Sequence, residues 1–534
     1  MISIRWTCMV GWLLFFAAIF AVFPLNGVLP GTTDVLCHIT AFHEHLKWLR
    51  EAVLGQDMGW SFYPEQGIHR YLELYWGQSA IFHVFATGLG LSDVWSAYGL
   101  LVVLYALNAW AVFAFVHVWV GRTGPAVLAG TAFAASAFLL GQYELHNSLG
   151  FFPVPLSLLL LRRWTRTRSG RHLIGSVFWL FLTPFFSGYA AFLGGFTWVS
   201  YALTIGAHRG AFHRPLPVLF SGLLAAVMIS PMAARVLFLS GPEVIDPMVH
   251  FSWVERDGFA LSSIGLISAL PGHLFYPTFT QSGLDQVVRI PYHVFPGFLV
   301  LVLAITGIRP GGRMAVWSVL IGSFGLVLAM NIVPLGIDLF RIPGRGFLLT
   351  QFAVAVLAGI GLNHLMPRIG HGWHGLAMIV ACAIVAFENV PFGYRPLAHP
   401  MPMQAPALFD AIPEERAVVA CLPSSLFTRS GYRDGLSEFN REYMYAYWQL
   451  QHGHDVVNGS AGFLSTDRLE WVDILGTPRA VEPEDLPSEI EYLLICPKLS
   501  LDSMEHARTN EWITRSEGRV LARSEEGVLI DVRP

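Results

Sequence analysis

Charge is the scarcest feature of this 534-residue chain. Asp, Glu, Lys and Arg together make up 13% of it, whereas hydrophobic residues make up 54%. A soluble globular protein normally carries about a quarter charged residues. The shortage extends from the N-terminus to residue 390 and then ends. The composition therefore excludes an ordinary soluble protein and indicates a polytopic α-helical membrane protein with a soluble C-terminal segment.

Cysteine is also rare, and the motifs of several common chemistries are missing. The five cysteines show no metal-ligand spacing. Cys421 and Cys496 share the C-terminal segment, where a disulfide and two free thiols are both compatible with the sequence. The chain has no Ser-His-Asp set, no phosphate-binding loop and no basic tract suited to nucleic acid. We therefore expect no nucleic-acid partner and no nucleotide-dependent chemistry.

Long apolar runs are what the chain has in abundance. About eleven of them reach or approach the roughly 17 to 25 residues that cross a bilayer as a helix. The first is not followed by a small-x-small cleavage site, so we expect it to stay as a span. The runs are 7–25, 95–119, 125–141, 147–161, 172–188, 190–206, 215–232, 292–308, 314–331, 347–364 and 374–390.

The connecting segments predict the orientation. With eleven spans, the Arg-rich connectors all fall on one side, which the positive-inside rule assigns to the cytoplasm. These connectors are 121–124, 162–171, 207–214, 309–313 and 366–375. The long loops 26–94 and 233–291 and the C-terminal segment fall on the other side. We expect a multi-pass protein of a bacterial inner membrane, with a cytoplasmic N-terminus and its aqueous chemistry outside.

The C-terminal segment has the pattern of a separate domain. We expect a transmembrane domain over 1–390, a Pro-rich linker over 391–410, and an extracytoplasmic α/β domain over 411–534. RAVVACLP and YLLICP each predict a short buried strand. RVLARSEEGVLIDV predicts a hairpin that turns at EEG, because apolar residues alternate on both sides of it.

The first long loop opens with a dense group of titratable residues. Asp34 and His38 lie four residues apart and share one face of a predicted helix. An apolar stripe on this helix predicts that it lies on the membrane surface; its members are Leu36, Ile39, Phe42, Leu46, Leu49 and Val53. The charged residues Glu44, Lys47, Arg50 and Glu51 are expected to face solvent. Asp34 suits either an N-cap or a functional acid.

This layout resembles the glycosyltransferase-C (GT-C) superfamily of polytopic membrane enzymes. The resemblance rests on a first span, an outer loop that begins with an acid, and a surface helix. GQDMGWSFYPEQG (55–67), HNSLGFFPVPLSLLLLRRW (146–164), FRIPGRGFLLTQFAVAVLAGIGL (340–362) and YMYAYWQLQHGHDVVNGSAGF (443–463) resemble segments of bacterial YfhO-type members. It implies a GT-C fold of about eleven spans.

The resemblance also implies an activity. GT-C enzymes transfer sugar from a polyprenyl-phosphate or polyprenyl-diphosphate donor to an extracytoplasmic glycan, lipid or protein. In an inverting transfer a carboxylate takes the proton of the acceptor hydroxyl. Asp34 is the residue that matches the acid of the first outer loop. His38 would orient this acid or bind phosphate, and the alternative is an ordinary interfacial histidine. No Asp-x-Asp or Glu-x-Asp motif occurs in this loop, so the sequence leaves open whether the enzyme requires a divalent cation such as Mg²⁺ or Mn²⁺.

Cationic residues are expected at the leaving lipid phosphate. Arg341 and Arg345 flank Pro343 and Gly344 immediately before a late span, where both guanidinium groups can reach one anion. The alternative is that both extend to lipid headgroups.

Further candidates come from three other segments. Glu144 and His146 either line the sugar pocket or cap helix ends. Tyr443 and His452 belong either to an acceptor surface or to an ordinary turn. Glu255 and Asp257 are candidates for a second acid, although no motif distinguishes them.

Two other functions are alternatives to that of an enzyme. The first is a transporter of polyprenyl-linked glycans, and the second is a non-catalytic scaffold of envelope glycan assembly. Transporters tend to carry internal repeats and ionisable residues in mid-membrane. In this chain the titratable groups gather at the outer edge of the spans, which favours the transferase.

Overall fold

The computed structural model describes most of the chain and shows two compact units. The described residues are 34–54, 75–141, 146–206, 244–245, 294–330, 332, 343–389, 404–414, 417–423, 432–433, 436–457, 464–465, 486–500 and 503–533. The first unit comprises Met1–Gly27, Leu74–Ala233 and Ser252–Pro396. The second comprises Val28–Glu73, Ala234–Phe251 and Leu397–Pro534. Each unit is therefore assembled from three separate segments.

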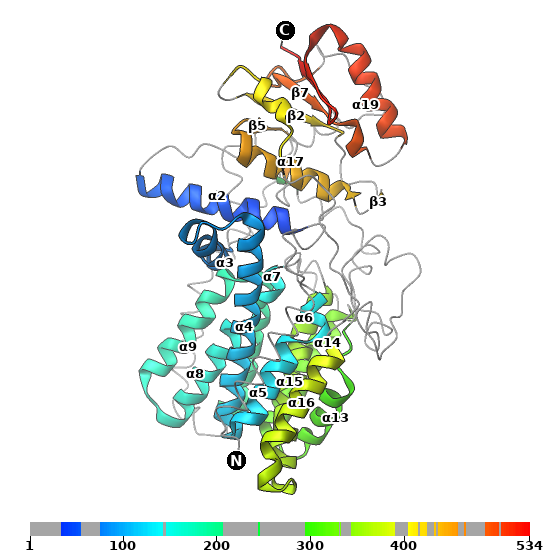
Figure 1. Cartoon of the computed structure of the whole chain (residues 1–534). Coiled ribbons are helices and arrows are strands. Elements are labelled where there is room, and N and C mark those ends of the chain that lie inside the picture. The colour runs from blue at the N-terminus through cyan, green and yellow to red at the C-terminus, as the bar shows by residue number, and fades with distance from the viewer. Residues whose placement is uncertain are drawn as a thin grey trace. The chain divides into compact units, whose positions relative to one another are not determined.

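The first unit is a bundle of helices (Figure 1). Its N-terminal part consists of α3 (Trp76–His83), the π-helix η2 (Val84–Gly88), α4 (Asp93–Val120), α5 (Thr123–Ala134), α6 (Ala137–Gly141), α7 (His146–Leu149), α8 (Pro153–Thr167), α9 (Gly170–Leu182), the 3₁₀ helix η3 (Thr183–Phe185), α10 (Gly188–Tyr201) and the π-helix η4 (Ala202–Gly206). Its later part consists of α13 (Phe298–Ile308), α14 (Gly312–Ala329), the 3₁₀ turn η9 (Pro343–Gly346), α15 (Phe347–Leu365), the 3₁₀ turns η10 (Met366–Arg368) and η11 (His371–Trp373), and α16 (His374–Asn389).

Four helical stretches among the described residues are long and apolar enough to cross a membrane. They are Asp93–Val120, Thr123–Gly141, Gly312–Ala329 and Gly344–Arg368. Two of the other predicted spans are shorter apolar helices, Phe298–Ile308 and His374–Asn389. The predicted runs 7–25 and 215–232 lie outside the described residues, so the total of eleven stays a prediction.

Small residues let the central helices of the first unit approach closely. A Cβ added to Gly307 of α13 would collide with the carbonyl oxygen of Leu357 in α15. Gly361 of α15 is equally close to the carbonyl oxygen of Leu303. Such contacts are typical of membrane helices, which associate through packing rather than through the hydrophobic effect.

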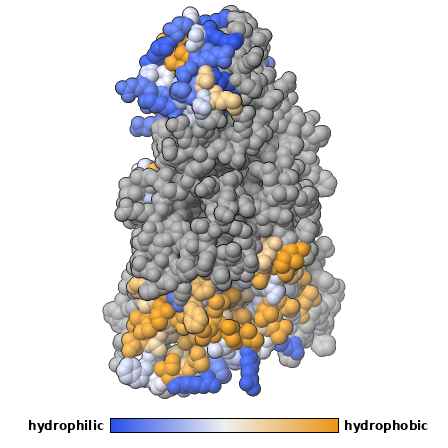
Figure 2. Space-filling view, turned by 90° about the vertical axis from the view of Figure 1, so that its right-hand side faces the viewer, coloured by the Kyte–Doolittle hydropathy of each residue, from blue (hydrophilic) through white to orange (hydrophobic). Residues whose placement is uncertain are grey.

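The surface of the first unit is that of a membrane protein. On the face shown in Figure 2, hydrophobic side chains gather in the lower part of the view, and hydrophilic residues lie beyond them at the lower end. Large exposed apolar residues include Trp110, Phe178, Val199, Ile305, Leu320 and Ile384. One end of the bundle carries exposed arginines at the turns between helices: Arg122, Arg163, Arg166, Arg168, Arg171, Arg309, Arg313 and Arg368. We call this end the arginine end.

The second unit contains a five-stranded mixed sheet in the order β5-β2-β7-β9-β8. Strands β5 (Asp455–Val456), β2 (Val418–Leu422) and β7 (Tyr492–Ile495) are parallel, whereas β9 (Val528–Asp531) is antiparallel to β7 and β8 (Val520–Arg523). The predicted strands in RAVVACLP and YLLICP are β2 and β7. The predicted hairpin is β8–β9, closed by a hydrogen bond of 2.9 Å from Ser524 N to Gly527 O.

Helices pack around this sheet and complete the core. Leu493, Ile495 and Trp512 form a buried cluster with residues of the neighbouring strands. Trp512 comes from α19 (Ser503–Arg515), and α17 (Glu438–His452) connects two short strands, β4 (Leu436–Ser437) and β5. Cys421 and Cys496 are both buried, and neither forms a disulfide. Of the two possibilities for these cysteines, the structure therefore has two thiols and not a disulfide.

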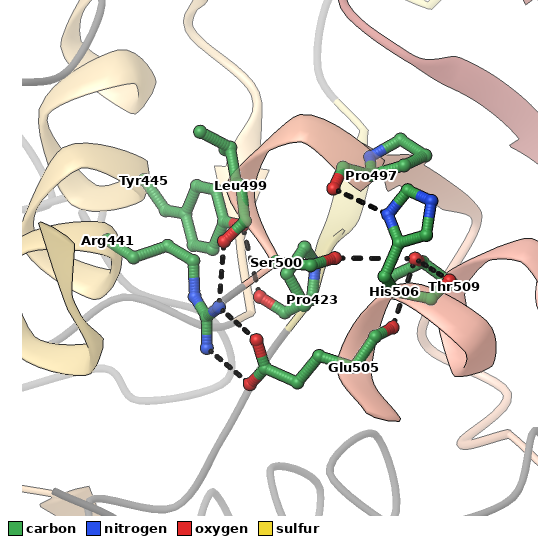
Figure 3. A network of polar contacts seen from close by, with 9 residues as sticks. All are labelled: Pro423, Arg441, Tyr445, Pro497, Leu499, Ser500, Glu505, His506 and Thr509. Atoms are coloured by element: carbon green, nitrogen blue, oxygen red, sulfur yellow. Dashed lines mark hydrogen bonds and ion pairs between the residues drawn. The ribbon is translucent and has the colours of Figure 1, made fainter. Parts of the chain in front are cut away.

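A buried ion pair joins α17 to α19. The guanidinium of Arg441 donates to Glu505 Oε2 at 2.9 Å and to Oε1 at 3.2 Å, and it also donates to Leu499 O (Figure 3). The Arg441 side chain is fully buried and that of Glu505 is 7% exposed. On the same helix, Tyr445 OH donates to Pro423 O at 3.0 Å. The pair fixes the position of α17 against the rest of the unit.

Both long loops contribute to the second unit. Helix α2 (Asp34–Leu54) packs along α17, and strand β1 (Val244–Ile245) pairs antiparallel with β6 (Leu464–Ser465). The expected boundary of the C-terminal domain, 411–534, stays a prediction. The compact unit that contains this segment also includes Val28–Glu73 and Ala234–Phe251.

Candidate functional site

Arg345 is a buried arginine of the first unit. It lies in η9, the turn that leads into α15, and is 4% exposed. The turn is held close to α14, because a Cβ on Gly346 would collide with Leu328 and with the carbonyl oxygen of Gly325. The backbone around Arg345 is thus fixed by close helix packing.

The guanidinium of Arg345 lies over an aromatic ring. Its central carbon is 4.1 Å from the ring centroid of Tyr189. Tyr189 is the second residue of α10, and the N-cap residue Ser187 accepts a hydrogen bond of 3.0 Å from Ala190 N. A cation over the face of a tyrosine gains about 0.5 to 2 kcal/mol, which is less than the cost of burying a charge without a counter-ion.

Within the described parts of the chain, no carboxylate pairs with Arg345. Its Nε atom is enclosed and makes no hydrogen bond there. Tyr189 is the second residue of α10, and the N-terminus of this helix carries the positive end of the helix dipole. A buried guanidinium without a carboxylate partner among the described residues is a candidate for binding an anion.

The other candidates of the first unit lie partly outside the described residues. His146 begins α7, which packs against α4 and α10. The segment of His146 therefore lies next to the helix that carries Tyr189. Glu144 and Arg341 lie outside the described residues, as do the two candidates for a second acid, Glu255 and Asp257.

In the second unit, the candidates from the first loop and from the C-terminal segment are carried by packed helices. Helix α2 begins at Asp34, and Tyr443 and His452 lie on α17, along which α2 packs. A carboxylate in the first turn of a helix interacts favourably with the helix dipole, so the N-terminal role stays compatible with Asp34. His38 is 5% exposed and stacks on Phe42 at a ring distance of 6.4 Å.

The surface-helix prediction for residues 34–54 needs a correction. Leu36, Ile39 and Phe42 of the apolar stripe are fully buried, so these side chains do not face a membrane. Glu44 was expected to face solvent, but it is only 9% exposed. The predicted helix is present. The predicted partner of its apolar face, the membrane, is wrong, because the sequence does not reveal that α17 packs against this helix.

His452 lies in the last turn of α17 and has an unusual environment. Its ring stacks on Phe409 of η12 (Ala407–Ala411) at 3.6 Å and lies 5.2 Å from the ring of His454. Burial, helped by the nearby His454, lowers the pKa of His452 to about 3. Nδ1 accepts the backbone N–H of His454 at 3.0 Å, so the neutral ring carries its proton on Nε2. His452 is therefore a neutral donor at physiological pH.

Two polar residues at the end of α16 were missed by the sequence analysis. Glu388 accepts hydrogen bonds from Leu299 N at 3.0 and 3.3 Å, and so caps the start of α13. Asn389 accepts from Ala137 N and donates to Val385 O. Tyr189 was also missed, although the polar tripeptide SGY between two predicted spans was a usable signal.

Metal binding has no support in the described part of the chain. No group of three or more His, Cys, Asp or Glu side chains is placed there to hold an ion. The side chain of Asp34 lies outside the described atoms.

Comparisons with known proteins bear on the fold. No family model matches the sequence, and no curated protein matches it. The structure is similar to the mycobacterial arabinofuranosyltransferase AftD, with a TM-score of 0.61 and 14% identity over the whole of this chain and 40% of that one. A mutant of AftD gives a TM-score of 0.63, also at 14% identity, over the whole of this chain and 42% of that one.

A further similarity, to ArnT from Cupriavidus metallidurans, covers 98% of this chain and 97% of that one at 12% identity. Its TM-score of 0.47 is too low to support a shared fold. The chain spans about two fifths of the length of AftD and has its fold. That fold is the one implied by the GT-C resemblance, whereas the likeness to YfhO-type members stays a prediction.

Proposed function

We propose that this membrane protein is a glycosyltransferase that takes sugar from a polyprenyl-phosphate-type donor. The observation that carries the proposal is the buried guanidinium of Arg345, which lies over the ring of Tyr189 and has no carboxylate partner among the described residues. A lipid phosphate at this end of the bundle would supply the missing counter-charge. The fold shared with AftD supports the same class of activity.

The residues divide the chemistry between them. Arg345, with Arg341 four residues earlier, would hold the phosphate and stabilise the negative charge that develops as the glycosidic bond breaks. Asp34 would accept the proton of the acceptor hydroxyl while that oxygen attacks the anomeric carbon, which inverts its configuration. His146 and Glu144 would line the sugar pocket. Tyr443 and His452 would contribute to the acceptor side.

The orientation is part of the proposal. Eight exposed arginines gather at the arginine end of the first unit, and the positive-inside rule would place this end in the cytoplasm of a bacterial cell. Arg345 precedes α15 and Arg368 follows it, so Arg345 lies at the opposite end. The donor phosphate would then be bound at the extracytoplasmic face, where a glycan, lipid or protein acceptor is available.

The distribution of charge in the spans favours a transferase over a transporter. In the described spans, Asp, Glu, Lys and Arg lie near helix ends, as with Asp93 in α4, Arg313 in α14 and Glu388 in α16. A transport pathway normally requires ionisable groups in mid-membrane. The bundle instead concentrates its charge at its two ends.

The test combines donor binding with transfer. Arg345→Gln should weaken the binding of a polyprenyl phosphate about 10- to 100-fold, because one charge-assisted contact contributes roughly 1.5 to 3 kcal/mol. Arg345→Lys should recover part of this affinity, and Arg368→Gln at the arginine end is the matched control. Unchanged affinity in Arg345→Gln would refute phosphate binding at this site.

A second variant separates chemistry from binding. Asp34→Asn should bind the lipid phosphate as the wild type does, but in a strain without the native protein it should lose a surface sugar and accumulate the lipid-linked donor. If Asp34→Asn restores the surface glycan fully, Asp34 is not the base. A transporter or scaffold would then be favoured over the transferase.

A further inference from the structure

Residues 76–95 form a helical hairpin of the first unit in which Asp93 is the sole Asp, Glu, Lys or Arg. The hairpin consists of α3, η2, a tight turn at Gly90, and the first turn of α4. Between Trp76 and Ser92 the sequence has no Asp, Glu, Lys or Arg. The hairpin closes through hydrogen bonds of 3.1 Å from Leu89 N to Val84 O and from Leu91 N to Phe85 O.

One face of this hairpin is fixed to the bundle. Gln78 donates through Nε2 to the carbonyl oxygen of Phe186, the residue that follows η3. Gly77 lies so close to the ring of Phe186 that a Cβ would collide with it. The ring of Phe85 is packed in the same way on Gly99 of α4. The hairpin therefore has a defined place at the end of the bundle opposite the arginines.

The other face is apolar and open. Val84 is 60% exposed, Leu89 64%, Leu91 40% and Trp95 38%. Four large apolar side chains in one stretch, with Asp93 as the sole charge among them, are not typical of a surface in contact with water. Such a surface marks a contact with a membrane or with another protein.

The open face continues the lipid-facing side of α4. From Trp95, half-exposed or exposed residues follow at helical spacing through Val102 and Ala106 to Trp110, which is 48% exposed. The stripe has no charged residue. A face that is continuous with the lipid contact of a span is expected to contact lipid too.

The length of α4 gives the depth of the hairpin. The helix has 28 residues and is therefore about 42 Å long, close to the roughly 40 to 45 Å of a bilayer with its headgroup regions. Arg122 follows its last turn. Trp95 lies about 37 Å along the axis from Val120, beyond the hydrocarbon core of about 30 Å and within the opposite headgroup region, where tryptophan is enriched.

We propose that residues 76–95 are an interfacial anchor that inserts Val84, Leu89, Leu91 and Trp95 into the bilayer boundary opposite the arginine end. Asp93 suits this depth, because a carboxylate in the first turn of α4 remains at the headgroups and interacts with the helix dipole. The anchor does not depend on the proposed transferase activity. It depends on lipid as the partner of the open face.

The test measures depth directly in the full-length protein. A bimane label is attached at Leu89→Cys in a chain whose five native cysteines are replaced by alanine, and the protein is reconstituted in phosphatidylcholine nanodiscs. Lipids brominated high on the acyl chains should quench this label more than lipids brominated near the chain ends. A label at Trp110→Cys should be quenched more by the lipids brominated near the chain ends. A label at Leu521→Cys in β8 should be quenched by neither kind of brominated lipid.

Aqueous iodide distinguishes the other outcomes. If iodide quenches the Leu89 label while brominated lipid does not, the tip lies in water and the proposal is overturned. If neither iodide nor brominated lipid quenches the label, the open face is covered by protein, either a second copy of the chain or another partner. Lipid is then excluded as its partner, and the proposal is again overturned. A label at Trp95→Cys repeats the test on α4 itself and should match Leu89.

Discussion

Protonation of His452 should destabilise the second unit below neutral pH. The pKa of this imidazole is lowered from 6.5 to about 3 by burial and by the neighbouring His454. Because the folded-state pKa is the lower one, the residue stabilises the unit above pH 6.5, and this contribution is lost as the pH falls towards 3. At pH 5 the unfolded chain has bound almost a full proton at this ring, whereas the folded unit has bound almost none.

The linkage relation gives the size of the effect. Between pH 8 and pH 5, His452 alone should lower the free energy of unfolding of the unit by about 2 kcal/mol. This value depends mainly on the ordinary pKa of 6.5, because pH 5 lies far above the folded-state value. Protection of the β5 amides against hydrogen exchange should therefore fall about 30-fold, after correction for the intrinsic effect of pH.

The assay is hydrogen exchange with mass spectrometry on the full-length protein in detergent. His452→Phe keeps a ring against Phe409 but has no proton to gain, so most of the pH dependence should disappear in this variant. The control is His506→Gln, since His506 is an exposed histidine of the same unit, and it should retain the wild-type dependence. An equal loss of protection in His452→Phe and the wild type would refute the reasoning.

Three further predictions concern packing and orientation. Glu505→Gln removes the buried carboxylate charge that pairs with Arg441 and should destabilise the second unit by about 3 to 5 kcal/mol, measured by the labelling of its buried thiols in denaturant. Gly361→Ala should lower the yield of folded protein, because the added Cβ meets the backbone of α13, whereas Gly195→Ala has open space and should not. Met504 of α19 and Trp373 of η11 are both exposed. In the proposed orientation, Met504→Cys should react with an impermeant maleimide in spheroplasts, whereas Trp373→Cys should react only after lysis.

Local patterns in the sequence predicted most of the elements. The long apolar runs correspond to α4, α14 and α15, because a membrane span must satisfy its backbone within one helix. The β8–β9 hairpin was visible for a similar reason, since its turn and alternating strands are contiguous. Each of these structures is specified by neighbours in the chain.

The contacts between distant segments were not predictable. The pairing of β1 with β6 and the packing of α2 on α17 join residues that are separated by hundreds of positions, and no local pattern identifies the partner of either element. Glu44 was assigned to solvent for this reason. Arg345 was identified from its sequence context, but its place over the ring of Tyr189 depends on the meeting of η9 with α10, which only the structure reveals.

The composition of the second unit from Val28–Glu73, Ala234–Phe251 and Leu397–Pro534 has a consequence for biosynthesis. A ribosome delivers the chain from its N-terminus at about 5 to 20 residues per second. Helix α2 emerges early, but its packing partner α17 follows about 390 residues later, after at least 20 seconds of synthesis. During that interval Leu36, Ile39 and Phe42 lack the cover that they have in the finished protein. A chaperone or the membrane surface itself is then needed to shield α2, and a chain that stops before α17 should be a substrate for quality-control proteases.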